Sequence, residues 1–186
     1  MNSPKRTIAI VCGGDSSEYE VSLRSAQGID SAFDHERYNV YIVMIRKNDW
    51  HVNLPDGRQP VIDKNDFSFM KDGEKIRFDY AYITIHGTPG ENGVLQGYFD
   101  MIDLPYSTCN VLVEALTFHK FALNNYLKAF GCSVPDSIQM GLHWSATSKA
   151  LSPGTRFKEV PKHSGIKVNN ALTLFGCNLH TESSSL

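Results

Sequence analysis

Short apolar runs alternate with amphipathic stretches along much of the chain. Residues 6–12 form an almost continuous apolar run rich in β-branched side chains, which is typical of a strand covered on both faces. Residues 38–45 and 79–85 predict two further strands, and residues 50–54 predict an antiparallel or edge strand. These runs indicate a mostly parallel sheet.

The first helix is expected over residues 18–33. Three apolar side chains of this interval share one helical face: Val21, Ile29 and Phe33. Ser17 and Glu20 fit the S-x-x-E capping box at the start of the helix, so Glu20 is assigned to capping.

Two more helices are expected farther along the chain. Residues 95–102 predict a short helix, residues 104–107 an edge strand, and apolar positions over residues 112–130 one long helix that ends at Gly131. Strands that alternate with helices in this way predict a doubly wound α/β fold.

Composition narrows the class of partner. The chain is 41% hydrophobic and can bury a core, and its 186 residues suit one domain, or one domain and part of a second. The net charge of -2 provides no basic field for nucleic acid or an anionic membrane, so a small-molecule partner is expected. No apolar window approaches the roughly 20 residues of a membrane span, and no signal peptide is evident, so a cytoplasmic location is expected.

The cysteines and the charge pattern add two further expectations. The 4 cysteines are far apart and form no C-x-x-C pair, which favours reduced, mostly buried thiols over a zinc site or disulfides. Residues 1–140 hold 13 Lys+Arg and 18 Asp+Glu, whereas residues 141–186 hold 5 and 2. The final segment therefore differs in character from the rest and is expected to pack poorly.

Two polar, glycine-containing segments follow buried strands: residues 13–22 and residues 86–93. Ligands of open parallel sheets gather beyond the carboxyl ends of the strands, so both segments fall at the expected binding edge. Glu18 can receive a substrate ammonium group or serve only the electrostatics of the helix start. His86 can donate a hydrogen bond to a substrate or be satisfied by the loop backbone.

Other candidates have weaker support from spacing alone. Lys120 lies within an apolar-periodic stretch, and its spacing favours a solvated surface lysine. Four aromatic residues are expected in the core or in pocket walls: Tyr82, Tyr98, Phe99 and Phe121.

Three segments carry a resemblance to a known family: GGDSSEYEVSL at residues 13–23, HGTPGENGVLQG at residues 86–97, and the PYS sequence that leads to Lys120. On these motifs the chain resembles the N-terminal region of D-alanine:D-alanine ligases, which are ATP-grasp enzymes. The resemblance implies a Rossmann-like, pre-ATP-grasp domain over residues 1–133 and, over residues 134–186, the start of a central ATP-grasp domain that passes into a divergent tail.

The resemblance also implies a reaction. The family uses ATP with Mg²⁺ or Mn²⁺ to phosphorylate the carboxylate of one D-alanine, and the amine of a second D-alanine attacks the acyl phosphate. The dipeptide serves peptidoglycan synthesis. Family members are commonly dimeric, so a homodimer is also expected.

Roles are carried over by position. Glu18 matches the carboxylate that holds the ammonium of the first D-alanine, His86 matches the histidine beside the acyl phosphate, and Lys120 matches a lysine that reaches the ATP phosphates. Glu18 and His86 are thus the expected catalytic residues. The expected substrate-binding residues are Glu18, Val21, Ser22, His86 and Gly87.

The chain departs from the family pattern in three places. Asn92 and His119 each stand where aspartate is usual. Beyond residue 140 the resemblance ends, and no metal ligands, adenine pocket or oxyanion-binding arginine are recognisable, so residues 141–186 are interpreted as a truncated, frame-shifted or otherwise altered segment. The isolated chain is therefore expected not to catalyse ligation. The alternative is a non-catalytic interaction domain that binds an intact ligase subunit.

Overall fold

The computed structural model describes residues 4–137, which fall into two units. The first extends to His119 and the second begins at Lys120. The expectations for residues 141–186, including the altered segment, lie outside the described residues, and the domain boundary at residue 133 stays a prediction.

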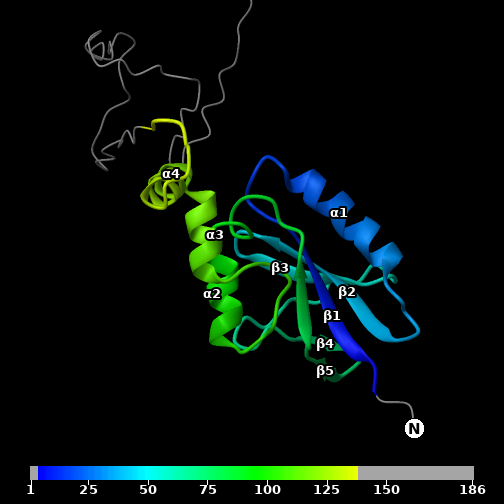
Figure 1. Cartoon of the computed structure of the whole chain (residues 1–186). Helices are drawn as coiled ribbons and strands as arrows, with labels where there is room; N and C mark the ends of the chain where they lie inside the picture. The colour runs from blue at the N-terminus through cyan, green and yellow to red at the C-terminus, as the bar shows by residue number, and fades with distance from the viewer. Residues whose placement is uncertain (1–3, 138–186) are drawn as a thin grey trace, which may run out of the picture. The chain divides into compact units, whose positions relative to one another are not determined.

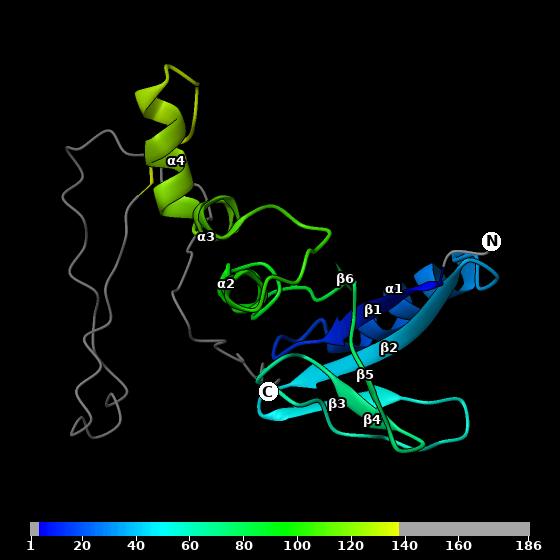
Figure 2. The ribbon, with the colours of Figure 1, turned by 90° about the horizontal axis from the view of Figure 1, so that it is seen from below.

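Four strands form the main sheet of the first unit (Figures 1 and 2). In spatial order they are β3 (Asp49–Asn53), β2 (Tyr38–Arg46), β1 (Arg6–Gly13) and β6 (Tyr80–Ile83). β1 pairs in parallel with β2 and with β6, and β3 is antiparallel to β2. The predicted α/β fold with a mostly parallel sheet is therefore confirmed, and so is the antiparallel strand expected at residues 50–54.

Both faces of β1 are buried, as its continuous apolar run predicts. Ile10 packs in the cluster on the side of α1 (Tyr19–Ala32), while Val11 belongs to the cluster on the side of α2 (Val94–Met101). Successive strand residues point to opposite faces, so the two helices cover opposite sides of the sheet (Figure 1).

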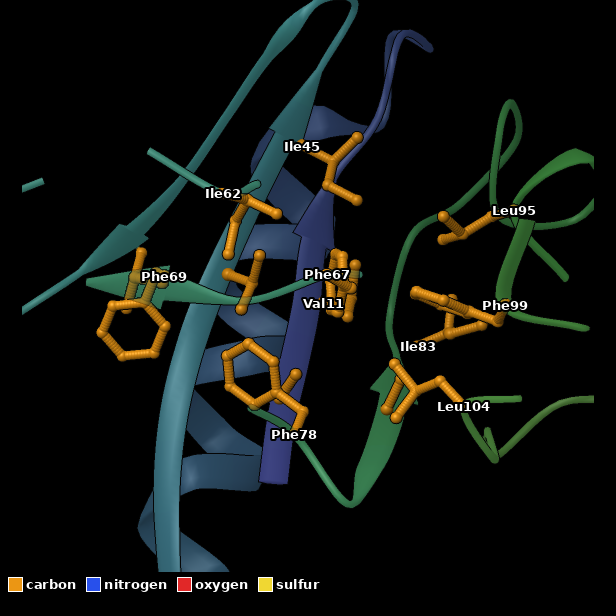
Figure 3. Close-up of a cluster of buried hydrophobic side chains, with 14 of the residues drawn as sticks. Val11, Ile45, Ile62, Phe67, Phe69, Phe78, Ile83, Leu95, Phe99 and Leu104 are labelled. Carbon is orange, nitrogen blue, oxygen red and sulfur yellow. The ribbon is translucent and has the colours of Figure 1, made fainter. Parts of the chain in front are cut away.

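An aromatic cluster fills the side of the sheet that faces α2 (Figure 3). Phe67 is 1% exposed, and its ring centroid lies 4.9 Å from that of Phe99 and 5.4 Å from that of Phe78. A hairpin of β4 (Phe69–Lys71) and β5 (Glu74–Ile76) contributes further side chains to this cluster. The sequence patterns did not predict this hairpin, because strands of three residues are too short to show a period of two.

The start of α1 differs from the predicted capping box. Glu18 is the N-cap residue, and its side chain makes no capping hydrogen bond. Ser17 therefore precedes the N-cap, and Glu20 does not occupy the N3 position that a capping box requires. Val21 is 39% exposed, whereas Ser22 and Ala26 are the buried residues of α1.

The long helix predicted over residues 112–131 is two helices. α3 (Val111–Phe118) ends at His119, whose φ of -87° and ψ of 87° leave the helical region. α4 (Lys120–Ala129) opens the second unit. Apolar spacing alone could not reveal this break, because both helices continue the same apolar periodicity.

The predicted edge strand at residues 104–107 is a single parallel bridge between Tyr106 and Ala81.

The described cysteines differ in exposure. Cys12 is buried, and burial raises the pKa of its thiol to about 12. Cys109 and Cys132 are exposed, so the expectation of mostly buried thiols was wrong among the described cysteines. Within residues 4–137, no helix has the length and apolar character needed to cross a membrane.

Candidate functional site

The strand order reverses at the carboxyl ends of β1 and β6. The chain passes from β1 through α1 to β2 on one side, while β6 pairs with β1 on the other side. In open α/β sheets, ligands bind where the strand order reverses in this way. The segments that carry Glu18 and His86 leave the sheet at this edge, one after each of the two strands.

The loop after β1 is held by backbone hydrogen bonds. The N–H group of Gly14 donates to the carbonyl oxygen of Ile45 at 2.7 Å, and the N–H group of Asp15 donates to the carbonyl oxygen of Thr88 at 2.9 Å. Gly13 and Gly14 have φ values of 103° and 93°, which L side chains rarely adopt. The two glycines let the backbone turn sharply and remain close to both neighbouring strands.

The side chain of Ser16 joins the two loops. Its Oγ donates a hydrogen bond to the carbonyl oxygen of His86 at 2.7 Å and accepts one from the N–H group of Glu18 at 3.2 Å. Glu18 itself is exposed at the first turn of α1. The backbones that present Glu18 and His86 therefore meet at one hydroxyl group.

Ser22 lies behind this contact and is fully buried. Its Oγ accepts a hydrogen bond from the N–H group of Gly13 at 2.9 Å and donates one to the carbonyl oxygen of Thr84 at 2.8 Å. The Ser22 hydroxyl thus ties the end of β1 to the segment after β6. A role of Ser22 in substrate binding stays a prediction, as do the roles of Val21 and Gly87.

Glu91 organises the loop after β6. Its Oε2 accepts a hydrogen bond from the N–H group of Gly87 at 2.7 Å, and its Oε1 lies 3.8 Å from Nδ1 of His86. The His86 side chain is 40% exposed, so the imidazole can reach a ligand. Gln96 supports the same loop from α2, because its Nε2 donates to the carbonyl oxygen of Gly90 at 2.6 Å.

A cavity of about 360 Å³ adjoins the imidazole of His86. Its lining comes from α1, from β6 with the loop after it, and from the segment before α3 and α3 itself, and it includes Ser25, Tyr82, Glu91, Thr108 and Glu114. A larger hollow of about 490 Å³ lies at the amino-terminal end of β2, among residues such as Tyr38 and Lys71. The smaller cavity is the one that adjoins a predicted site residue.

Two further expectations concern Lys120 and a metal ion. Lys120 is exposed at the first residue of α4, in the second unit, so its convergence with Glu18 and His86 stays a prediction. Within residues 4–137, no three His, Cys, Asp or Glu side chains come together in a group that could hold a metal ion.

Three contributors to the site were missed by the sequence analysis. Ser16, Thr84 and Glu91 act through hydrogen bonds to backbone groups that lie far away in sequence or across a loop. Ser16 had a usable signal, since a serine between glycines and a helix start commonly bonds to nearby backbone groups. Thr84 gave no such signal within its apolar strand.

Comparison with known proteins now decides the family. The family model described as "D-ala D-ala ligase N-terminus" matches residues 7–109, which include both loops of the site. The chain belongs to the D-Ala-D-Ala ligase family. The recognition that rested on the two loop motifs is therefore confirmed.

Curated ligases of other bacteria match the N-terminal part of the chain. A D-alanine--D-alanine ligase of Phocaeicola vulgatus is 66% identical over 134 residues, which are 72% of this chain and 41% of that protein. The ligase of Bacteroides thetaiotaomicron is 63% identical over 134 residues, again 72% of this chain and 41% of that protein. The chain thus spans about 41% of the length of the curated ligases it matches.

Solved ligase structures share the fold. D-alanyl-alanine synthetase A of Vibrio cholerae superposes with a TM-score of 0.62 at 29% identity, covering 74% of this chain and 40% of that one. A D-alanine--D-alanine ligase of Bacillus anthracis, solved in complex with ATP, gives a TM-score of 0.54 at 25% identity. The match covers 72% of this chain and 38% of that one.

The structure also accounts for one departure of this ligase-family chain from the usual motif. Oδ1 of Asn92 accepts a hydrogen bond from the N–H group of Val94 at 3.3 Å, at the start of α2. Nδ2 of Asn92 donates to Oγ1 of Thr88 at 3.1 Å. Asparagine therefore keeps the turn without the negative charge of aspartate.

Proposed function

We propose that this chain supplies the first D-alanine site of a D-alanine:D-alanine ligase. The observation that supports this proposal is the meeting of the Glu18 and His86 backbones at the Ser16 hydroxyl, at the carboxyl edge of β1 and β6. Glu18 is exposed there and His86 is 40% exposed. A carboxylate at this position binds the ammonium group of D-alanine, and the imidazole donates a hydrogen bond toward the carboxylate end.

The remaining chemistry of the family reaction belongs to the same proposal. ATP supplies the phosphoryl group that activates the D-alanine carboxylate, and the cationic amine of Lys120 suits the phosphate oxygens. The described residues do not fit a Mg²⁺ or Mn²⁺ site. We place the product in peptidoglycan synthesis and the protein in the cytoplasm, where ATP is available.

The D-alanine site is tested by titrating the full chain with D-alanine and following backbone amide resonances. Glu18→Gln is expected to raise the dissociation constant by about tenfold or more, because a hydrogen bond to a charged group contributes about 1.5–3 kcal/mol. The resonances that move in the unchanged chain are expected to lie in the loops after β1 and β6.

Glu20→Gln provides the matched control. Glu20 is also an exposed acidic residue in the first turn of α1, so its removal changes the net charge and the helix-start electrostatics equally. This variant is expected to bind D-alanine as the unchanged chain does. Equal losses in the two variants would contradict a specific role for Glu18.

Ligation by the isolated chain is a separate question. Positioned groups on both walls of a cleft are needed for the reaction, and only one wall is recognisable in this sequence. The expected result is no release of ADP above that of the Glu18→Gln variant when D-alanine, ATP and Mg²⁺ are supplied. Turnover above that control would overturn this expectation. Association with an intact ligase subunit stays the alternative, and light scattering of the chain alone and mixed with such a subunit tests it.

A further inference from the structure

We propose that Ser16 is a positioning residue that sets the spacing between Glu18 and His86. The proposal deepens the proposed function and rests on it for the identity of the ligand. Ser16 is assigned no contact with substrate. Its effect passes through the two backbone segments that it joins.

The first support is the pair of hydrogen bonds made by one hydroxyl group. Oγ of Ser16 donates to the carbonyl oxygen of His86 at 2.7 Å while it accepts the N–H group of Glu18 at 3.2 Å. Glu18 and His86 are 68 positions apart in the sequence. The hydrogen bond that Ser16 donates therefore joins the two loops, whereas the one that it accepts lies within the loop after β1.

The second support is the close fit between Ser16 and the opposite loop. A Cβ atom added to Gly87 would lie 2.9 Å from Cβ of Ser16, so a larger residue at position 87 would push the loops apart. Gly87 also has a φ of 75°, which favours glycine. The Ser16 hydrogen bond thus joins the two loops at a point where residue 87 has no side chain to separate them.

The third support is the hydrogen bond that the N–H group of Glu18 makes to Ser16. Glu18 is the N-cap residue of α1, and its side chain makes no capping hydrogen bond. Its N–H group depends on Ser16 for a partner. A shift of Ser16 would consequently move the residue proposed to hold the substrate ammonium group.

The test compares Ser16→Ala with Ser17→Ala in the full chain. Ser17 is the adjacent residue, is exposed and receives the same substitution. Ser16→Ala is expected to weaken D-alanine binding about tenfold, as the loss of one to two hydrogen bonds implies, and Ser17→Ala is expected to leave it within about twofold.

A readout in the free protein separates positioning from a local role. The N–H group of Asp15 bonds to the carbonyl oxygen of Thr88 across the same two loops, without using the Ser16 side chain. If Ser16 holds the loops together, hydrogen exchange of the Asp15 amide should be about tenfold faster in Ser16→Ala than in Ser17→Ala. Faster exchange at Glu18 alone, with unchanged exchange at Asp15 and unchanged D-alanine binding, would overturn the proposal.

The two proposals can fail separately. Absence of D-alanine binding by the unchanged chain would refute the first D-alanine site, and the Asp15 exchange would still decide whether Ser16 holds the loops. If Ser16→Ala does not fold, Ser16→Cys nearly preserves the side-chain volume while replacing the hydroxyl with a weak hydrogen-bonding thiol. The same two measurements then apply to that variant, with unchanged values again overturning the proposal.

Discussion

Replacing Phe67 with alanine is expected to lower the free energy of unfolding by about 3–5 kcal/mol, the usual loss for a buried phenylalanine. The Phe67 side chain is 1% exposed, and its ring lies within 6.1 Å, centroid to centroid, of four other aromatic rings. Those rings come from β3, from α2 and from the segment before β6, so the cavity left by the substitution would be shared among several elements. Urea denaturation followed by circular dichroism measures the loss.

Phe118→Ala is the matched control for this prediction. Phe118 is 42% exposed on α3, so the same truncation removes far less buried surface. We expect a loss below about 1 kcal/mol, as is common for surface positions. Similar losses in the two variants would show that Phe67 does not occupy a tightly packed position.

Gly13→Ala is expected to destabilise the protein by about 3 kcal/mol, through left-handed backbone strain and steric overlap together. Gly13 has a φ of 103°, and an added Cβ atom would overlap the backbone carbonyl oxygen of Ile45 in β2. A backbone carbonyl within a paired strand cannot swing aside as a side chain can. The midpoint of thermal or urea unfolding measures the change.

Gly57→Ala separates the two causes. Gly57 also has a left-handed φ, of 84°, but no atom lies within 4 Å of an added Cβ. Backbone strain alone is therefore expected, at about 1–2 kcal/mol. Equal losses at Gly13 and Gly57 would mean that the overlap with Ile45 is relieved by movement of the loop after β1.

The strands and the edge that carries the candidate site were predictable from sequence because each has a local signal. The run at residues 6–12 is apolar on both faces and ends at two glycines, and β1 with its turn follows that pattern. The same holds for the apolar residues that lead to His86. Strand pairing then places the two loops at one edge without further information, since the carboxyl ends of parallel strands coincide.

The contacts within the site could not be predicted in the same way. The bond between Ser16 and the His86 carbonyl depends on the exact separation of two loops, which no periodicity encodes. The capping box failed for a similar reason, because S-x-x-E identifies a helix start only to within a residue or two. The break at His119 is also invisible to apolar spacing, which continues from α3 into α4.

The flanks of the sheet bear on how the molecule behaves at high concentration. At the outer edge of β3, the N–H group of Val52 donates to the carbonyl oxygen of Pro60. At the outer edge of β6, the N–H group of Ala81 donates to the carbonyl oxygen of Pro105. Proline has no amide hydrogen, so neither covering segment offers an uninterrupted row of donors to an approaching strand. Exposed strand edges can pair with strands of other molecules and start aggregation. These two short segments cover the sheet edges of the first unit and so oppose such pairing between molecules.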